Sequence, residues 1–123
     1  MTRLASLYGR WVGGTPQPGW EFVPYLRGGD PVAIAALDGR EIHFAIAPEW
    51  RGRLMTEARI REFLQPLLER KDFLVTRVPR DIDDHDSLVQ FVERIGFERT
   101  GDSGAHIHYM LCALPAREIR KES

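Results

Sequence analysis

The sequence predicts an α+β domain with a single mixed, mostly antiparallel sheet and helices on its faces. The first observation is a strand-like alternation of apolar residues that recurs before residue 48. The second is a helix-like spacing of apolar residues after residue 56, followed by strand, helix and hairpin patterns. A strand–helix–strand step requires a parallel, right-handed crossover, so the predicted sheet is mixed.

Length, composition and charge restrict the classes of protein to consider. The chain has 123 residues, the size of one domain, and 43% of them are hydrophobic, which is enough for a core. A net charge of −1 argues against a dedicated nucleic-acid-binding protein, whose affinity rests on neutralising phosphates. No apolar run approaches the ~18–20 residues of a membrane span, and the N-terminus has no hydrophobic signal core. Cys112 is the only cysteine, so we expect a reducing, cytoplasmic setting.

Three regions are expected along the chain. Residues 1–19 are predicted to form an N-terminal arm or short helix, because apolar residues in 1–12 precede a breaker run at 13–19 that is rich in glycine and proline. Residues 20–115 are predicted to form the folded domain, and residues 116–123 a polar tail.

The first half of the domain is predicted to be an antiparallel sheet followed by a helix. Strands are expected at 20–26, 32–37 and 41–47, with a turn at 28–31 and a strong hairpin signal at Asp38-Gly39. Apolar residues between 58 and 68 then recur at helical spacing. Pro66 removes one helical hydrogen bond, at a cost on the order of 3 kcal/mol, so we expect a kink or an early end near Gln65.

The second half is predicted to contain a strand, a helix and a hairpin. A strand at 73–78 leads into an acidic loop at 79–86. Ser87 and Gln90 have the spacing of a capping box. The helix that follows is expected to end at Gly96, a typical helix-ending glycine. Its buried stripe is predicted to be Leu88, Phe91, Val92 and Ile95. Strands at 97–100 and 105–114, joined by a turn at 101–104, complete the sheet.

Basic residues stand at the predicted start of the first long helix. A helix start leaves about four backbone N–H groups free and carries a partial positive charge. Arg51 and Arg53 lie at that end, where cations are normally disfavoured, so they suggest that an anion such as a phosphate binds there. The alternative is that both arginines are solvated, or pair with Glu49 and Glu57.

The order of elements resembles the GNAT superfamily of acyl-CoA-dependent acyltransferases, over roughly residues 32–114. The resemblance is carried by Ile46-Ala47-Pro48-Glu49-Trp50-Arg51-Gly52-Arg53 and by Arg94-Ile95-Gly96-Phe97. In that family a strand ends near a proline, and an Arg/Gln-x-x-Gly-x-Gly/Ala turn holds the coenzyme A pyrophosphate at a helix start. The resemblance implies acetyl-CoA as cofactor. It places the cofactor-binding residues at Ile46, Arg51, Gly52, Arg53, Leu54, Met55, Thr56 and His85.

The sequence departs from the family pattern at several of these positions. The two family glycines fall on Leu54 and Thr56, whose Cβ atoms obstruct a close approach of the backbone to a phosphate. The family's frequent tyrosine acid falls on Val92, and its frequent asparagine falls on His85. The N-terminal part is also shorter than the family's usual opening.

Glu41 and His43 are the candidate catalytic residues. They are predicted to lie on one face of their strand, where the family often places a base or a residue that positions a water. Either side chain has the chemistry to deprotonate an acceptor amine. The alternative is an exposed glutamate and a packed histidine.

No metal site is predicted. His106 and His108 have a spacing that can chelate zinc, but no second ligand pair matches them, and strand packing is the simpler explanation. The acidic loop lacks the glycine and closing glutamate of a calcium loop, so helix capping or solvation explains it better.

Two functions therefore stay open. The first is N-acyl transfer from acyl-CoA to the amine of a small molecule or protein. The second is a non-catalytic GNAT-like structural or assembly module, of the kind that bacteriophages encode, with a bacterial cytoplasm or a virion as its location. We also expect self-association or a protein partner, with residues 1–20 acting as a clasp.

Overall fold

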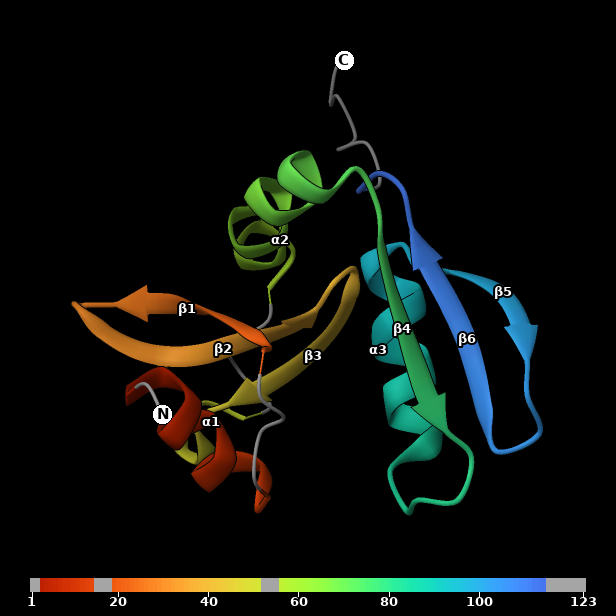
Figure 1. Cartoon of the computed structure of the whole chain (residues 1–123), viewed down its shortest axis with the longest axis horizontal. Helices are drawn as coiled ribbons and strands as arrows, with labels where there is room; N and C mark the ends of the chain where they lie inside the picture. Colours follow the sequence, from red (N-terminus) through yellow and green to blue (C-terminus); the bar gives the residue numbers. More distant parts are fainter. Residues whose placement is uncertain (1–2, 15–18, 52–55, 115–123) are drawn as a thin grey trace. The chain divides into compact units, whose positions relative to one another are not determined.

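The structure is a computed structural model that describes residues 3–14, 19–51 and 56–114. Within those ranges the chain forms three α-helices and six strands, which confirms the predicted α+β class with a mixed sheet. The chain divides into two compact units, Met1–Phe63 and Leu64–Ser123 (Figure 1). The predicted polar tail and the predicted cofactor residues Gly52, Arg53, Leu54 and Met55 lie outside the described residues.

The first unit contains an antiparallel sheet of three strands, as the sequence predicts. Its strands are β1 (Glu21–Arg27), β2 (Asp30–Asp38) and β3 (Glu41–Ile46). The β1–β2 hairpin turns at Gly28 and Gly29, whose φ angles of 60° and 86° need glycine or a similarly permissive residue. The second hairpin turns after Asp38, which pairs with Glu41, and so confirms the hairpin signal in the sequence.

The first helix covers one face of this sheet. α1 (Arg3–Val12) is an ordered helix rather than an arm, and it lies against all three strands (Figure 1). Tyr8 is buried between the helix and the sheet, where it packs with Ile34, Ala36 and Ala45. The apolar face of α1, which was predicted to act as a clasp on a partner, therefore packs against the sheet of its own unit.

The second helix begins on the opposite face of the same sheet. After a short 3-10 turn (η1, Pro48–Trp50), α2 extends over Glu57–Lys71. Phe63 lies with its ring centroid 5.3 Å from that of Tyr25 and 5.9 Å from that of Phe44. The Tyr25 hydroxyl also donates a hydrogen bond to Glu62. These contacts fix the first half of α2 on the sheet face that α1 leaves open.

The predicted early end of this helix near Gln65 is wrong. α2 continues through Pro66 to Lys71. Leu64, Leu67 and Leu68 are buried around the proline, whereas Pro66 itself is exposed. Burial of the leucines offsets the one hydrogen bond that the proline removes.

The second unit is built from β4 (Leu74–Pro79), α3 (His85–Ile95), β5 (Glu98–Asp102) and β6 (His106–Leu111). β6 pairs antiparallel with both β4 and β5, and α3 packs against β4 (Figure 1). The pairing of β5 with β6 shifts register between Arg99 and Gly101 and continues to Asp102. The turn predicted at 101–104 therefore begins later than expected. The last strand is also shorter than the predicted 105–114.

Two predictions about α3 are wrong, and one is confirmed. The helix begins at His85 after Asp84, without a side-chain cap, so Ser87 lies inside the first turn and forms no capping box. Leu88 is 36% exposed, because the buried face consists of Val92 and Ile95 further along the helix. The helix ends at Gly96 as predicted; its φ angle is 121°, and the Phe97 amide bonds to the carbonyl of Val92.

Candidate functional site

Glu41 and His43 lie together on β3, as the sequence predicts. The Nε2 atom of His43 is 3.5 Å from Oε2 of Glu41, and both side chains are partly buried. The imidazole also stacks on the indole of Trp20, with ring centroids 5.1 Å apart and an interplanar angle of 6°. A carboxylate and an aromatic plane therefore hold the histidine ring in position.

This cluster and Ile46 belong to opposite faces of β3. Side chains alternate along a strand, so Glu41 and His43 share the α1 face with Ala45, while Ile46 shares the other face with Phe44. An amine that reaches His43 would approach on the α1 face. The predicted cofactor contact of Ile46 would come from its side chain on the other face or from its backbone.

Arg51 makes contacts that the sequence did not suggest. Its Nε donates to the carbonyl of Ile46 at 3.0 Å, and one Nη donates to the carbonyl of Trp11 at 2.8 Å. The side chain thus links the end of α1 to the end of β3. An anion that binds Arg51 would have to share the guanidinium with these carbonyls or displace them.

The start of α2 is ordered by Thr56. Its hydroxyl oxygen accepts a hydrogen bond from the amide of Arg59 at 3.2 Å, and its carbonyl accepts one from Ile60. Thr56 is therefore the N-cap of the helix, which leaves its hydroxyl proton able to donate. The guanidinium of Arg59 lies over the ring of Trp50, 5.9 Å from its centroid.

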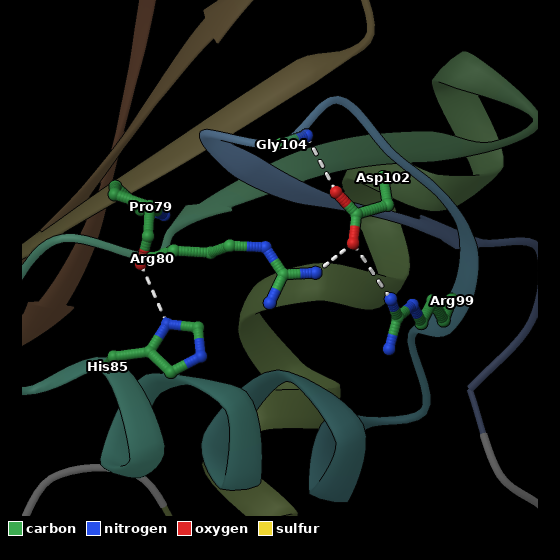
Figure 2. Close-up of polar contacts among 6 residues, drawn as sticks. All are labelled: Pro79, Arg80, His85, Arg99, Asp102 and Gly104. Atoms are coloured by element: carbon green, nitrogen blue, oxygen red, sulfur yellow. Dashed lines mark hydrogen bonds and ion pairs between the residues drawn. The ribbon is translucent and has the colours of Figure 1, made fainter.

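His85, the predicted cofactor contact of the second unit, is the first residue of α3. Its Nδ1 lies 2.7 Å from the carbonyl oxygen of Pro79 at the end of β4 (Figure 2). A carbonyl can only accept, so Nδ1 carries the proton, and in the neutral ring Nε2 carries the lone pair. The strand end thus sets the tautomer of His85.

A cluster around Asp102 was not found from the sequence. Asp102 accepts hydrogen bonds from Arg80, from Arg99 at 3.0 Å and from the amide of Gly104 at 2.7 Å (Figure 2). The run Gly101-Asp102-Ser103-Gly104 carries the signal of an aspartate turn, which the contact to Gly104 forms. Arg99 lies three residues from Asp102 in β5, whereas Arg80 comes from a distant segment, so its contact has no local signal.

Tyr109 occupies the buried face of β6. Its hydroxyl donates to Glu93 of α3 at 2.8 Å. Burial, and next the hydrogen bond to Glu93, raise the pKa of Tyr109, so the phenol stays protonated at neutral pH. Val92, which stands where the GNAT family often has its tyrosine acid, is buried and has no proton to donate.

The described residues contain no metal cluster, since no three His, Cys, Asp or Glu side chains among them come together as ligands. His106 and His108 alternate with Ile107 and Tyr109 along β6, and both are partly buried. No helix in the described part of the chain is both long and apolar enough to cross a membrane.

Comparison with known proteins identifies the fold. No protein-family model matches the sequence, and no curated protein matches it. A structure from Pyrococcus horikoshii matches with a TM-score of 0.57 at 16% identity, over 75% of this chain and 64% of that one. A ribosomal-protein-alanine N-acetyltransferase from Brucella melitensis gives a TM-score of 0.55 at 16% identity, over 88% and 78%. A GNAT-superfamily phosphinothricin acetyltransferase from Sinorhizobium meliloti, solved with AcCoA, gives 0.53 at 17% identity, over 87% and 66%.

At these identities the likeness concerns the fold alone. The chain has the fold found in GNAT-superfamily acetyltransferases, as the sequence resemblance implied. It spans 64% of the length of the Pyrococcus horikoshii protein.

Proposed function

We propose that the protein transfers an acyl group from acyl-CoA to an amine. The observation that carries the proposal is the pairing of Glu41 with His43 on β3, with Trp20 stacked on the histidine, in a fold found in GNAT acetyltransferases. A half-buried histidine held by a carboxylate has the chemistry of a general base. The structures from Brucella melitensis and Sinorhizobium meliloti, which are named as acetyltransferases, make acyl transfer the first reaction to test.

The proposed reaction assigns one task to each residue of the cluster. The bound acyl-CoA supplies the acyl group as a thioester, and the amine nitrogen attacks its carbonyl carbon as the carbon–sulfur bond breaks. His43 takes the proton that the amine loses, and Glu41 stabilises the imidazolium that results. Trp20 keeps the ring in a fixed plane, which holds the base in position.

We propose that the start of α2 holds the phosphates of the cofactor. Thr56 offers a hydroxyl there, and the first amides of the helix and its dipole favour an anion. We propose the strip from Ile46 through Arg51, Gly52, Arg53, Leu54 and Met55 to Thr56 as the phosphate side of the site. His85 is proposed separately as a contact to the cofactor, with its Nε2 as the available atom.

Binding of acetyl-CoA tests this proposal directly. A ligand at ~100 times its dissociation constant adds ~2.7 kcal/mol to stability, so the melting temperature should rise with acetyl-CoA. Arg51→Ala should reduce the size of that rise, whereas Arg10→Ala, an exposed arginine on α1, should leave it unchanged. No rise at millimolar acetyl-CoA would exclude the acyltransferase proposal.

The second candidate function is that of a non-catalytic structural or assembly module. The specific version of this proposal is a component of a phage virion. Two observations favour it: Arg51 is already bonded to backbone carbonyls, and Val92 is buried where the family acid would stand. The absence of an acetyl-CoA response, together with co-purification of a stable protein partner, would support this candidate.

A further inference from the structure

The carbonyl that sets the tautomer of His85 belongs to the peptide bond between Pro79 and Arg80. Its oxygen lies 2.7 Å from Nδ1 of His85, and the N–H of the same peptide bond donates to the carbonyl of Ala105 at 2.9 Å. A peptide bond is planar, so holding its N–H on one side fixes the direction of its C=O on the other. The turn between β5 and β6 is therefore connected to His85 through a single peptide plane.

The side chain of Arg80 is held by the same turn. Its guanidinium donates to the carboxylate of Asp102, which also accepts from Arg99 at 3.0 Å and from the amide of Gly104 at 2.7 Å (Figure 2). An ion pair at the protein surface is weak when it stands alone, but here three donors converge on one carboxylate. Arg80 is thus bound to residues 102–105 by its side chain and by its backbone amide.

The shape of β5 allows Asp102 to collect these donors. Residues three apart on a regular strand point to opposite faces of a sheet, yet Arg99 contacts Asp102. The pairing of β5 with β6 shifts register between Arg99 and Gly101, and an irregularity of this kind re-aims the side chains beside it. Such irregularities are frequent next to functional sites.

We propose that Asp102 is a positioning residue for His85. It holds Arg80, the Pro79–Arg80 peptide plane keeps its carbonyl directed at Nδ1 of His85, and Nε2 of the neutral ring presents its lone pair to a bound ligand. The ligand group that fits this atom is a hydrogen-bond donor, an N–H or an O–H, and not an anion. The identification of that ligand as acyl-CoA rests on the proposed function, whereas the connection from Asp102 to His85 does not.

The tautomer of His85 depends on this connection. A neutral imidazole carries its proton on either nitrogen, and the hydrogen-bond partner of one nitrogen decides which. If the peptide plane turned away, the proton could move to Nε2, and the ligand would meet a second donor in place of an acceptor. Asp102 is therefore expected to act on a ligand through the position of one proton.

The position of that proton can be measured without any ligand. Long-range nitrogen–proton NMR spectra distinguish a protonated ring nitrogen from one with a lone pair, and His85→Gln assigns the signals of His85 among the four histidines. In the native chain, at a pH where the ring is neutral, Nδ1 should carry the proton. Asp102→Ala should mix the two tautomers, so that the two nitrogen signals move toward each other. Unchanged signals in this variant would overturn the proposal.

Arg99→Gln is the matched control. It removes one donor to Asp102 and one charge of the cluster, but it leaves on the carboxylate the side chain of Arg80, which leads to His85. It should keep the native tautomer, although the melting temperature should fall in both variants. Equal mixing of tautomers in Arg99→Gln and Asp102→Ala would show a general loosening of the hairpin and would contradict a positioning role.

Arg80→Met breaks the contact with Asp102 from the other side. It removes the guanidinium and keeps the backbone amide that donates to Ala105. It should mix the tautomers of His85 as Asp102→Ala does, and it decides the question if Asp102→Ala does not fold. A native tautomer in folded Arg80→Met would show that the backbone contact alone holds the peptide plane, and the proposal would fail.

Binding of acetyl-CoA separates this proposal from the proposed function. His85→Ala should weaken binding, measured by calorimetry, by about threefold to tenfold, the usual effect of one neutral hydrogen bond. Asp102→Ala should weaken it by no more than that, and the double variant should bind as His85→Ala alone does. If the native chain does not bind acetyl-CoA, the proposed function fails, and the NMR spectra still decide the role of Asp102. If it binds and the two effects add, the connection between Asp102 and His85 is refuted.

Discussion

Tyr109 makes the stability of the protein depend on pH in the alkaline range. Burial and the hydrogen bond to Glu93 raise its pKa above the ordinary value of 10.0, although Arg99 and Arg80 oppose the shift. A pKa raised by folding contributes stability that is complete below the unfolded pKa and is lost as the pH rises through the folded pKa. The free energy of unfolding, measured in urea, should therefore fall as the pH rises above the ordinary tyrosine pKa of 10.0.

Tyr109→Phe should show a smaller fall over the same range. Some pH dependence should remain in this variant, because burial also raises the pKa values of Tyr8 and Tyr25. A fall of equal size in Tyr109→Phe and the native chain would show that the Tyr109 phenol does not contribute.

Glu41 and His43 should affect the reaction rate and not the binding of the cofactor. General base catalysis contributes ~10²–10⁴-fold to a rate, so His43→Gln should lower kcat for acyl transfer within that range. Glu41→Gln should lower it less, because Glu41 acts through the histidine. Rates are measured by release of free thiol, and acetyl-CoA binding by thermal shift. His108→Gln, on β6, is the matched control and should retain the native rate.

Pro66 lowers the stability of α2 relative to the same helix with an ordinary residue at this position. Proline inside a helix removes a hydrogen bond and crowds the preceding turn, at a cost of up to about 3 kcal/mol. Pro66→Ala should therefore raise the free energy of unfolding by about 1–3 kcal/mol, since Pro66 is exposed and the substitution removes no buried contact. Urea unfolding measures the change. A loss of stability would show that the neighbouring turns have adapted to the proline.

Elements with strong local signals were predicted well from the sequence. The first three strands, the Asp38 hairpin and the glycine end of α3 follow from alternation and turn chemistry, which act over a few residues. The capping box was predicted wrongly, because α3 begins at His85 and Ser87 lies inside its first turn. The early end of α2 was also predicted wrongly, because the leucines around Pro66 are buried and the helix continues to Lys71. The predicted burial of Leu88 was also wrong, because the buried face of α3 is narrower than the apolar pattern in the sequence suggested.

The candidate site was predicted only in part, for the same reason. The pairing of Glu41 with His43 is local to one strand and follows from its period of two. The stacking of Trp20 on His43, the hydrogen bond from Tyr109 to Glu93 and the contact of Arg80 with Asp102 join segments far apart in the sequence. The sequence pattern within one segment does not indicate which distant segment it contacts.

β1 and β5 are edge strands, and an edge strand can pair with a second copy of the protein. β5 carries Glu98, Arg99 and Asp102, and charges of this kind discourage pairing between edges. β1 is more apolar, and Leu26 on it is 50% exposed. We predict that the protein self-associates through β1, and that it sediments faster than a monomer at high concentration.

Leu26→Lys should shift that equilibrium toward the monomer, because it places a charge on the edge. Thr100→Lys, an exposed position on β5, is the control and should leave the equilibrium unchanged. Monomeric sedimentation of the native chain at all concentrations would contradict self-association through β1.

The stacking of His43 on Trp20 also gives the protein an intrinsic optical signal. An imidazolium accepts an excited electron from an indole much better than a neutral imidazole does, and the two rings lie face to face at 5.1 Å. The fluorescence of Trp20 should therefore decrease as His43 gains a proton. A variant that carries Trp11→Phe and Trp50→Phe would isolate this emission. The protonation of the proposed base could then be followed in solution, without a label and before any substrate is known.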